Sequence, residues 1–460
     1  MWECRESIKW RRSQAYIETR DVQEFGNDRQ NDREFSSLTA SGVAHNVSVA
    51  LLTGGADRPY VFGLGTALIA REAAALDLIG SDELDCPEFH CKPGVNFLNL
   101  RGDQRQDASF LRKAHRIATY YMNLIRYAAT AKPRIFHILW NNKFQLFDRT
   151  VLMLYYRSLG KRIVLTVHNV NAGRRDSKDT RLNRSTLRIQ YQLADHIFVH
   201  TEKMKSELVE EFGMQGAHVT VIPFGINNAV PNTCLTQSAA RQLLGIRQGE
   251  KTILFFGNIT PYKGLEYLVT AFQQIHTRCD DYRLIIAGKP DKCERYWVAI
   301  RNQISENVSS RQVLLRAEFI PDVETELYFK AADVLVLPYR HVYQSGVLFL
   351  GQSFGLPVLA ADVGSMRDEI VEGKTGFVFR PEDPNDLAKA IEQYFASDLY
   401  ADLNSRRREI RDHATERHSW DVVSQMTMSV YADLLRRLSP KKSLNCDASS
   451  SASLDVNTPS

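Results

Sequence analysis

Lys263 closes a glycine-bounded loop, GNITPYKG, that runs from Gly257 to Gly264 between an apolar run and a helical pattern. Glycine at the end of a strand lets the backbone approach a ligand closely, and a lysine at the end of such a loop can pair with a diphosphate. A solvated loop lysine is the ordinary alternative. Because Lys263 lies between two glycines that suit this geometry, we favour the phosphate-binding interpretation.

A second candidate for an anion site is the dipeptide Ser345-Gly346, which lies between the apolar run Val334 to Leu337 and a helical pattern. The first N–H groups of a helix lack internal partners, and the helix dipole is positive there, so a phosphate is held easily. An ordinary buried strand–helix–strand unit without a ligand is the alternative. On this stretch alone, that alternative is the better interpretation.

Two further positions follow apolar runs. Val47 to Leu52 ends at Thr53-Gly54-Gly55, and Ile163 to Val167 ends at His168. The glycine pair is weak evidence, because this fold requires a tight turn there with or without a ligand. A strand-end histidine should face a cleft between domains, and a structural histidine with a local hydrogen bond is an equally good interpretation.

Short apolar runs alternate with helical segments along most of the chain, which is typical of parallel sheets covered on both faces. In the second half, the run from Val313 to Ile320 is expected to be one of the strands. Two such series predict the α/β class, with two doubly wound, Rossmann-like domains facing across a cleft. The expected divisions are a disordered or loosely ordered extension 1–46, a first domain 47–226, a linker 227–249, a second domain 250–414, a helix 415–438 that packs back on the first domain, and a disordered tail 439–460.

The composition is that of an ordinary globular protein: 460 residues, 44% hydrophobic, 24% charged, with a net charge of +4. This charge is too weakly basic to predict a nucleic-acid partner, while anionic substrates and an anionic membrane surface remain compatible. Seven scattered cysteines without paired zinc spacing predict isolated reduced thiols. We see neither a leader with an apolar core nor an uninterrupted apolar span, so we expect a cytoplasmic protein with membrane contact at most peripheral.

Four motifs of the second half, in this order, carry a family resemblance: GNITPYKGLEYLVTAF, LIIAGKP, FIPDVETELYFKAADVLVLPYR and SFGLPVLAADVGSMRDEIVEGKTGFVF. Together they strongly resemble the retaining glycosyltransferases of family 4, which have the GT-B architecture. In the first half the resemblance is fainter and rests on VALLTGG, TVHNV and VHTEKMKSEL.

The resemblance implies that a nucleotide diphosphate sugar is bound by the second domain and an acceptor by the first. Lys263 matches the family lysine that meets the diphosphate, and His168 matches a strand-end histidine near the sugar or acceptor, which makes both of them candidate catalytic residues. The residues implied at the nucleotide sugar are Gly257, Asn258, Lys263, Arg340, Gln344, Ser345, Gly346, Val347 and Glu369, and those on the acceptor side are Gly54 and Gly55.

The chain departs from the family pattern in two places. The two glutamates that usually meet the sugar and the ribose are replaced by Val342 and Leu350, whose side chains accept no hydrogen bond. The arginine that is common before the lysine is also missing, so Arg340 is expected to supply its charge, with a surface arginine as an equal alternative. Glu369 resembles a family glutamate near the nucleotide, although an exposed helix glutamate would look the same.

We therefore expect an enzyme, a hexosyltransferase that moves a sugar from a nucleotide diphosphate sugar to a hydroxyl acceptor with retention of configuration. The expected acceptor is a saccharide or a lipid-linked molecule, in polysaccharide or glycolipid assembly, and contact with the inner membrane surface is peripheral. No metal-ligand cluster and no cofactor is expected. The alternatives are a catalytically weak nucleotide-sugar-binding partner subunit and a sugar-nucleotide epimerase. The cationic segment Arg174 to Arg188 is interpreted as a solvated loop, with a lipid-phosphate patch as the alternative.

Overall fold

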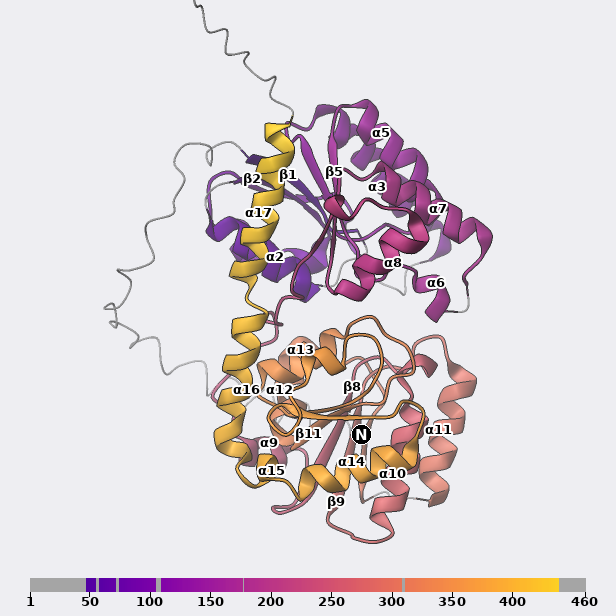
Figure 1. Ribbon diagram of the computed structural model, residues 1–460, viewed down its shortest axis with the longest axis vertical. Coiled ribbons are helices and arrows are strands. Elements are labelled where there is room, and N and C mark those ends of the chain that lie inside the picture. The colour runs from indigo at the N-terminus through magenta and orange to yellow at the C-terminus, as the bar shows by residue number, and fades with distance from the viewer. Residues whose placement is uncertain are drawn as a thin grey trace, which may run out of the picture. The chain divides into compact units, whose positions relative to one another are not determined.

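The structure is a computed structural model that describes residues 47–54, 58–71, 74–104, 109–176, 178–307 and 311–437. The expected N-terminal extension and C-terminal tail lie outside these ranges, as does Gly55. The described residues form two parallel sheets and the helices that cover them (Figure 1).

The first sheet has seven parallel strands in the order β3-β2-β1-β4-β5-β6-β7. The order reverses between β1 and β4, which is where ligands bind in open sheets of this kind. Alternate residues of β1 point to different cores: Val49 and Leu51 to one face, Ala50 and Leu52 to the other. The strands are β1 (Val47–Leu52), β2 (Ala74–Gly80), β3 (Val95–Asn99), β4 (Ile135–Ile138), β5 (Arg162–Thr166), β6 (His196–Val199) and β7 (Val219–Val221).

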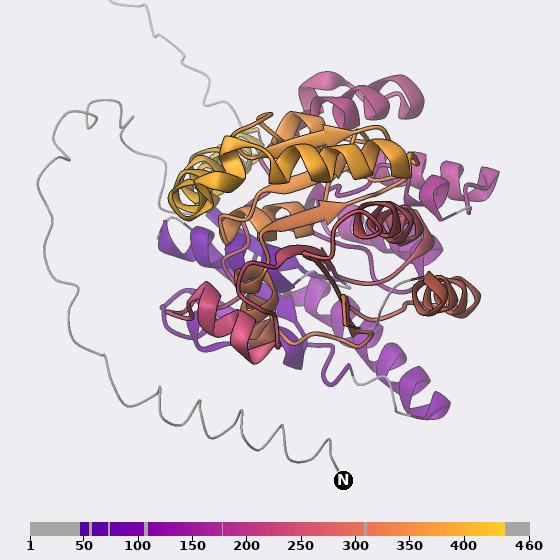
Figure 2. The ribbon, with the colours of Figure 1, turned by 90° about the horizontal axis from the view of Figure 1, so that it is seen from below.

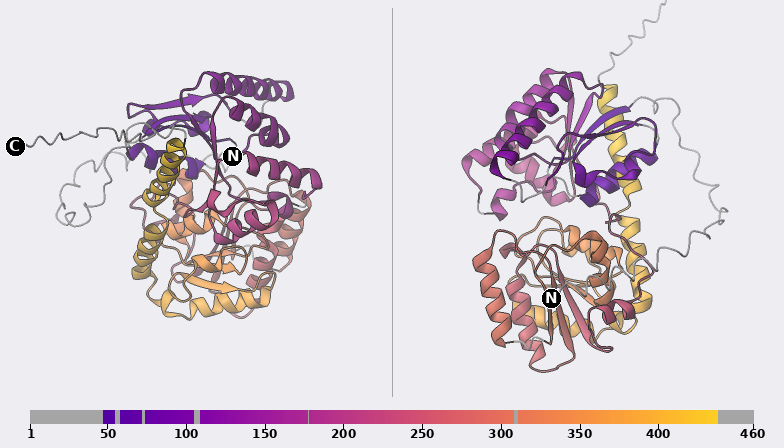
Figure 3. Two further views of the ribbon diagram at one scale, coloured as in Figure 1. Left: turned by 45° about the horizontal axis from the view of Figure 1, so that its top comes forward. Right: turned by 180° about the vertical axis from the view of Figure 1, so that it is seen from behind.

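Helices cover both faces of this sheet, as the right-hand view of Figure 3 shows. One face carries α3 (Phe110–Thr130), α5 (Met153–Ser158), α7 (Arg181–Leu193) and α8 (Glu202–Phe212). The other face carries α2 (Arg58–Ala70) and α17 (Trp420–Arg436). Shorter elements join them: η2 (Asp82–Leu84), η3 (Pro87–Phe89), α4 (Gln145–Phe147), η4 (Asp148–Leu152), α6 (Ala172–Arg175) and η5 (Gly216–His218).

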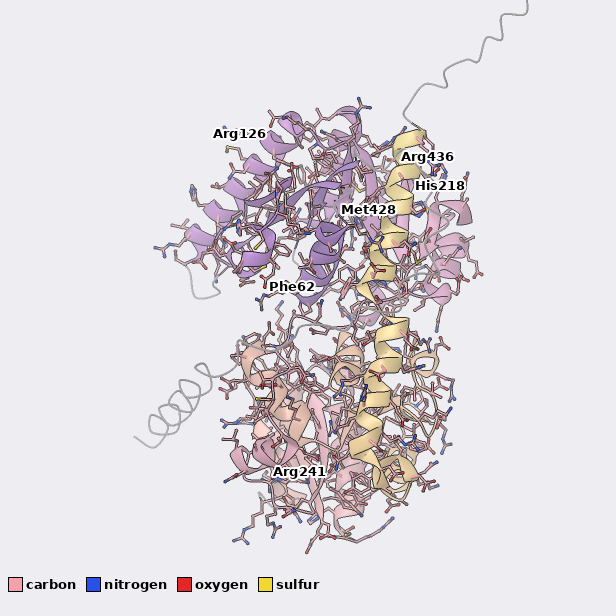
Figure 4. The ribbon with its side chains drawn as sticks, turned by 90° about the vertical axis from the view of Figure 1, so that its left-hand side faces the viewer. Phe62, Arg126, His218, Arg241, Met428 and Arg436 are labelled. Carbon is pink, nitrogen blue, oxygen red and sulfur yellow. The ribbon has the colours of Figure 1, made fainter. Side chains whose placement is uncertain are left out.

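Helix α17 comes from the C-terminal end of the chain yet lies beside α2 (Figure 4, where Met428 and Phe62 mark the two helices). The Tyr431 hydroxyl lies 2.6 Å from Nδ1 of the buried His137, in β4. Trp420 packs where Gly63 of α2 has no side chain, and a Cβ at Gly63 would meet the indole at 2.0 Å. The helix is therefore part of the core around the first sheet.

The second sheet has six parallel strands in the order β10-β9-β8-β11-β12-β13, with the reversal between β8 and β11. These two sheets confirm the predicted α/β class of two doubly wound domains. The strands are β8 (Lys251–Phe256), β9 (Tyr282–Ala287), β10 (Val313–Arg316), β11 (Val334–Leu337), β12 (Val358–Ala361) and β13 (Gly376–Phe379). β10 ends four residues before Ile320, because Glu318 and Phe319 are exposed and give the chain no buried face to continue.

Helices again lie on both sides (Figure 2). One core includes residues of α10 (Leu265–His276), α11 (Glu294–Asn307), α14 (Pro384–Phe395), α15 (Asp398–Ala401) and α16 (Leu403–Arg417). The other includes α9 (Gln237–Leu243), α12 (Asp322–Ala331) and α13 (Gly346–Ser353). Short turns η6 (Pro261–Lys263) and η7 (Arg367–Glu369) complete this part.

Helix α9 lies within the segment expected to be a linker. Its Ala240 is fully buried in the second core, and Arg241 forms an ion pair of 2.6 Å with the buried Asp333. This short helix is therefore packed on the second sheet, and the connecting chain lies before it.

Candidate functional site

A cavity of about 480 Å³ lies at the carboxyl ends of the central strands of the second sheet. Gly257 and Gly288, which follow β8 and β9, line it together with the start of α13. Tyr60 and Asn169, from the part of the chain that forms the first sheet, line it as well. This is the edge at which open α/β sheets bind their ligands.

Lys263 is the most unusual residue of this cavity. Its side chain is 6% exposed, and no carboxylate of the described residues lies within ion-pair distance. Burial, and then the nearby Arg175 cation, lower the pKa of Lys263 to about 8. A buried ammonium beside a second cation is unfavourable unless an anion joins it, so the site is prepared for a negatively charged ligand.

The backbone at Gly257 makes this arrangement possible. Its φ is +97°, and a Cβ there would lie 2.8 Å from the Lys263 Nζ and 3.5 Å from the Val347 side chain. Three separate loops thus converge on one point, with space left only because residue 257 has no side chain. Gly264 (φ +65°) ends the loop, and a Cβ there would collide with the Pro338 carbonyl at 2.0 Å.

The start of helix α13 supplies two N–H groups to the cavity. Gly346 and Val347 both line it, and no backbone hydrogen bond from either N–H is found within the described ranges. Ser345 precedes the helix without capping it, since its hydroxyl lies 3.4 Å from that of Tyr339. Gln344 also lines the cavity and donates a 3.4 Å hydrogen bond to Glu369. These groups can accept an anion and hydrogen-bond a polar ligand.

The two positions where the family has glutamates do line the cavity, with apolar side chains. Val342 and Leu350 both contact it, and Leu350 is 6% exposed. Asp322 is the one carboxylate among the described lining residues, and Arg58 pairs with it at 2.6 Å. The cavity is therefore cationic, with Lys263, Arg175 and Lys289 on its wall.

Of the other residues expected at the nucleotide sugar, one lines the cavity and two do not. Asn258 lines the cavity. Arg340 does not: its guanidinium pairs with Glu382 at 3.1 Å and approaches Glu266 at 4.0 Å. Glu369 does not line it either, since its carboxylate lies 3.0 Å from His418 Nε2. Carboxylate and imidazole partners draw these two side chains away, and Glu369 reaches the cavity only through Gln344.

Arg175 is the cation that sequence reasoning missed. It lies over the Tyr262 ring, 4.6 Å from its centroid, and its Nε donates a 2.7 Å hydrogen bond to Asp176. The sequence shows that Arg175 lies in a cationic segment, but nothing in that segment distinguishes it from its neighbours. Arg174 and Arg184 are also paired with acidic residues, among them Glu211 and Asp179, but they do not line the cavity.

A second, smaller cavity of about 190 Å³ lies at the ends of β4 and β5. His168 lines it, stacked on Trp140 with ring centroids 4.0 Å apart. Asn169 lines both cavities, so the two adjoin at that residue. Gly54 (φ +57°) lines neither; a Cβ there would meet the Trp140 carbonyl oxygen at 2.0 Å, so its described role is close packing at the strand end.

His168 belongs to a short chain of hydrogen bonds. His200 Nδ1 lies 3.3 Å from the Ile222 carbonyl and donates to it, so His200 Nε2 accepts from His168 Nδ1 at 3.0 Å. Burial lowers the pKa of His200 to about 4 and that of His168 well below its usual range. His168 Nε2 is thus unprotonated, buried and without a partner among the described residues.

No group of three histidine, cysteine, aspartate or glutamate side chains in the described part of the chain is placed to hold a metal ion. None of the described helices is long and apolar enough to cross a membrane.

Two doubly wound parallel sheets with a cationic cavity at their strand ends define the GT-B class of fold. The family model "Glycosyl transferases group 1" matches residues 250–397, and "Glycosyltransferase Family 4" matches residues 60–230. The two models together account for well over half of the chain. The chain belongs to family 4 of the group 1 glycosyltransferases.

Among curated relatives, D-inositol 3-phosphate glycosyltransferase of Corynebacterium urealyticum is 25% identical over 245 residues, 52% of this chain and 57% of the relative. The chain thus matches a little over half the length of that relative. Two solved structures share the fold. Sucrose-phosphate synthase of Thermosynechococcus elongatus has a TM-score of 0.67 at 19% identity, covering 85% of this chain and 100% of that one. HepE of Anabaena with UDP and glucose has a TM-score of 0.65 at 15% identity, covering 84% of this chain and 100% of that one.

Proposed function

We propose that this protein is a glycosyltransferase that moves a hexose from a nucleotide diphosphate sugar to a hydroxyl acceptor. The observation that carries the proposal is Lys263, a buried cation without a carboxylate partner, at the point where Gly257 and the start of α13 converge. A diphosphate is the ligand that satisfies all three groups at once. Family membership supports a sugar donor, and the structure of HepE with UDP-glucose suggests uridine as the base to test first.

In the reaction, the bond between the anomeric carbon and the diphosphate oxygen breaks, and the acceptor oxygen bonds to that carbon. The leaving diphosphate gains negative charge, which the Lys263 ammonium and the N–H groups of Gly346 and Val347 stabilise. The acceptor hydroxyl enters beside Asn169 and gives up its proton to an oxygen of the leaving diphosphate, and the configuration is retained. His168 lines the adjoining cavity, but its unprotonated Nε2 has less than 1 Å² of accessible surface, so a hydroxyl group would reach it only after neighbouring side chains move.

The sugar is held without the usual pair of glutamates. Gln344, Ser345 and Asn258 are the polar side chains near Val342 and Leu350 in the cavity, and their hydrogen bonds would replace the missing ones. The donor is then bound chiefly through its phosphates and base. The products we propose are those of polysaccharide or glycolipid assembly; the C. urealyticum relative is named for a phosphorylated polyol acceptor.

The proposal is tested by titrating UDP, GDP and ADP into the protein in a calorimeter, then following nucleotide release from a panel of nucleotide sugars. We expect one diphosphate to bind and its sugar nucleotide to be slowly hydrolysed without an acceptor. Lys263→Ala should weaken binding roughly tenfold or more, because a charge-assisted contact is lost. Lys389→Ala, on the exposed side of α14, is the matched control and should behave as the wild type.

The apolar Val342 and Leu350 favour one alternative, a nucleotide-sugar-binding partner subunit. That alternative predicts tight donor binding with no hydrolysis or transfer to any acceptor, and an effect of Lys263→Ala on affinity alone. An epimerase would instead convert the sugar nucleotide without an acceptor and leave the diphosphate linkage intact.

We further propose peripheral contact with an anionic membrane through helix α3 and its neighbour α5. Between Asp107 and Asp176 the sequence has thirteen lysines and arginines and a single acid, the buried Asp148. Along α3 the exposed residues Leu111, His115, Ala118, Met122, Ile125 and Ala129 recur at spacings of four and three, which places them on one face.

The apolar side chains of this surface continue onto the next helix. Tyr155 of α5 donates a 3.1 Å hydrogen bond to the Ile125 carbonyl, and Val151 and Leu154 beside it are 55% and 53% exposed. Exposed cations such as Arg126 (Figure 4) flank the same face. Apolar residues bordered by cations suit a bilayer with anionic headgroups.

A further inference from the structure

The cavity beside His168 contains a buried arginine. Arg149 of η4 is 8% exposed and lines this cavity together with His168, Asn141 and Gln190. A single water needs roughly 10–15 Å³ of such space. The volume of about 190 Å³ therefore has room for a polar group of several atoms next to the guanidinium.

Only one side of this guanidinium is used. Nη1 donates to the Asn183 side chain at 2.9 Å and to the Thr186 hydroxyl at 3.3 Å. Nε is buried without a partner, and no hydrogen bond from Nη2 is found within the described ranges. Nε has less than 1 Å² of accessible surface and cannot reach a ligand, so the free edge of the guanidinium is Nη2, from which a carboxylate or phosphate can accept a charge-assisted hydrogen bond.

No acid in the described part of the chain neutralises Arg149. The carboxylate of its neighbour Asp148 lies beyond 4 Å and accepts instead from the Tyr121 hydroxyl at 2.9 Å and from Asn142 at 3.3 Å. Burial is the main cause that lowers the pKa of Arg149, which means that its charge is poorly solvated. A buried charge without a counter-ion is costly, so the arrangement is suited to an anion supplied from outside.

The guanidinium is also held in place before any ligand arrives. Asn183, which accepts from Nη1, donates to Asn171 at 2.9 Å, and Asn171 donates to Asp179 at 2.9 Å. Thr180 caps the start of α7 by accepting from the Asn183 N–H at 3.1 Å. The partners of Arg149 are therefore fixed by the first turn of α7, which holds the guanidinium in the cavity wall.

We propose that this cavity binds an oxyanion group of the acceptor, a phosphate monoester or a carboxylate, on the free edge of Arg149. The inference rests on the proposed transferase function and names the class of acceptor. Because Asn169 lines both cavities, an anion held at Arg149 would direct the rest of the acceptor toward the donor cavity. Arg149 is then a residue that determines acceptor specificity.

The test is calorimetry with sn-glycerol 3-phosphate, D-glycerate and glycerol, in the presence of saturating UDP so that the donor cavity is filled. We expect at least one of the two anions to bind and neutral glycerol not to bind. Arg149→Gln should weaken anion binding about tenfold or more, because a charge-assisted hydrogen bond from a buried cation is lost. Arg157→Gln removes an exposed arginine of α5 that does not line the cavity, and should bind as the wild type does.

A second variant decides the question if Arg149→Gln does not fold. Gln190→Glu adds a negative charge to the same cavity wall at the cost of the hydrogen bond that Gln190 donates to Asn141, and this charge should repel the anion and weaken its binding. Failure of both anions to bind, or equal anion affinity in the wild type and the folded variants, would overturn the proposal. UDP binding in the same proteins keeps the two proposals distinct: retained UDP affinity without anion binding removes only the acceptor inference.

Discussion

At the scale of single residues, the buried charge of Lys263 lowers the stability of the ligand-free protein and favours the binding of an anion. A pKa lowered from 10.5 to about 8 means that the folded protein disfavours the charged form. At 1.36 kcal/mol per pKa unit, this costs the ligand-free protein about 3 kcal/mol at neutral pH. Lys263→Met should therefore raise the urea midpoint of unfolding at pH 7, and UDP should raise the thermal midpoint of the wild type but not that of the variant.

The pH dependence gives the sign of this effect. Between pH 8 and pH 10.5 the unfolded chain binds a proton at Lys263 that the folded chain has released, so wild-type stability rises with pH. The difference between Lys263→Met and the wild type should shrink across this window. A variant that is less stable than the wild type at pH 7 would contradict this account, and Lys389→Met is the exposed control.

Some residues of the site were open to prediction and others were not. Gly257, Lys263 and Gly346 lie next to the apolar runs that become β8 and α13, so local pattern was enough to place them at a strand end or a helix start. Arg175 and Arg149 were not recognisable, because their importance depends on where the fold places them and on which partners it gives them. That property is set by distant residues such as Tyr262 and Asn183.

At the scale of elements, the first sheet contains buried histidines that must stay neutral. Burial lowers the pKa of His137 to about 3 and the pKa values of His196 and His200 to about 4. It also lowers the pKa of His168 well below its usual range. Between pH 6.5 and about pH 4 the unfolded chain binds protons at these sites that the folded chain does not. Stability should therefore fall with falling pH, by up to about 1.4 kcal/mol per pH unit for each histidine.

Urea unfolding followed from pH 7.5 to pH 4.5 measures this slope. His200→Gln should lessen it, because one of the titrating groups is removed, while Leu243→Gln changes an exposed residue that does not titrate and should leave it as it is. A midpoint that does not change over this range would show that the buried histidines do not titrate on unfolding.

The elements themselves were largely predictable. Continuous apolar runs such as Val334 to Leu337 became fully buried strands, because a parallel sheet is covered on both faces. The run from Val313 was predicted to extend to Ile320 and was four residues too long. Exposure begins within the strand, at Leu315, and the polar residues and the 70% exposed Phe319 after Arg316 are the local sign that the strand does not continue.

At the scale of the whole molecule, a net charge of +4 hides an uneven distribution. The cations between Asp107 and Asp176 include Arg112, Arg126 and Lys132, all exposed, and the only acid of that stretch is buried. Average composition could not reveal this surface, because acidic residues elsewhere balance it. Its apolar stripe emerges only when the spacing along α3 is combined with the observed exposure of each position.

This surface predicts binding to anionic vesicles. The protein should sediment with vesicles of phosphatidylcholine mixed equally with phosphatidylglycerol, and not with phosphatidylcholine alone. Each cation near the membrane contributes about 1 kcal/mol, so Arg126→Gln should weaken binding roughly fivefold, and added salt should weaken it further.

Replacing Met122 and Ile125 by aspartate should abolish binding, because both exposed apolar contacts are lost and two negative charges are added. Leu243→Asp, at a 56% exposed apolar residue of α9, is the matched control. Equal binding to both kinds of vesicle, or loss of binding in the control alone, would rule this surface out.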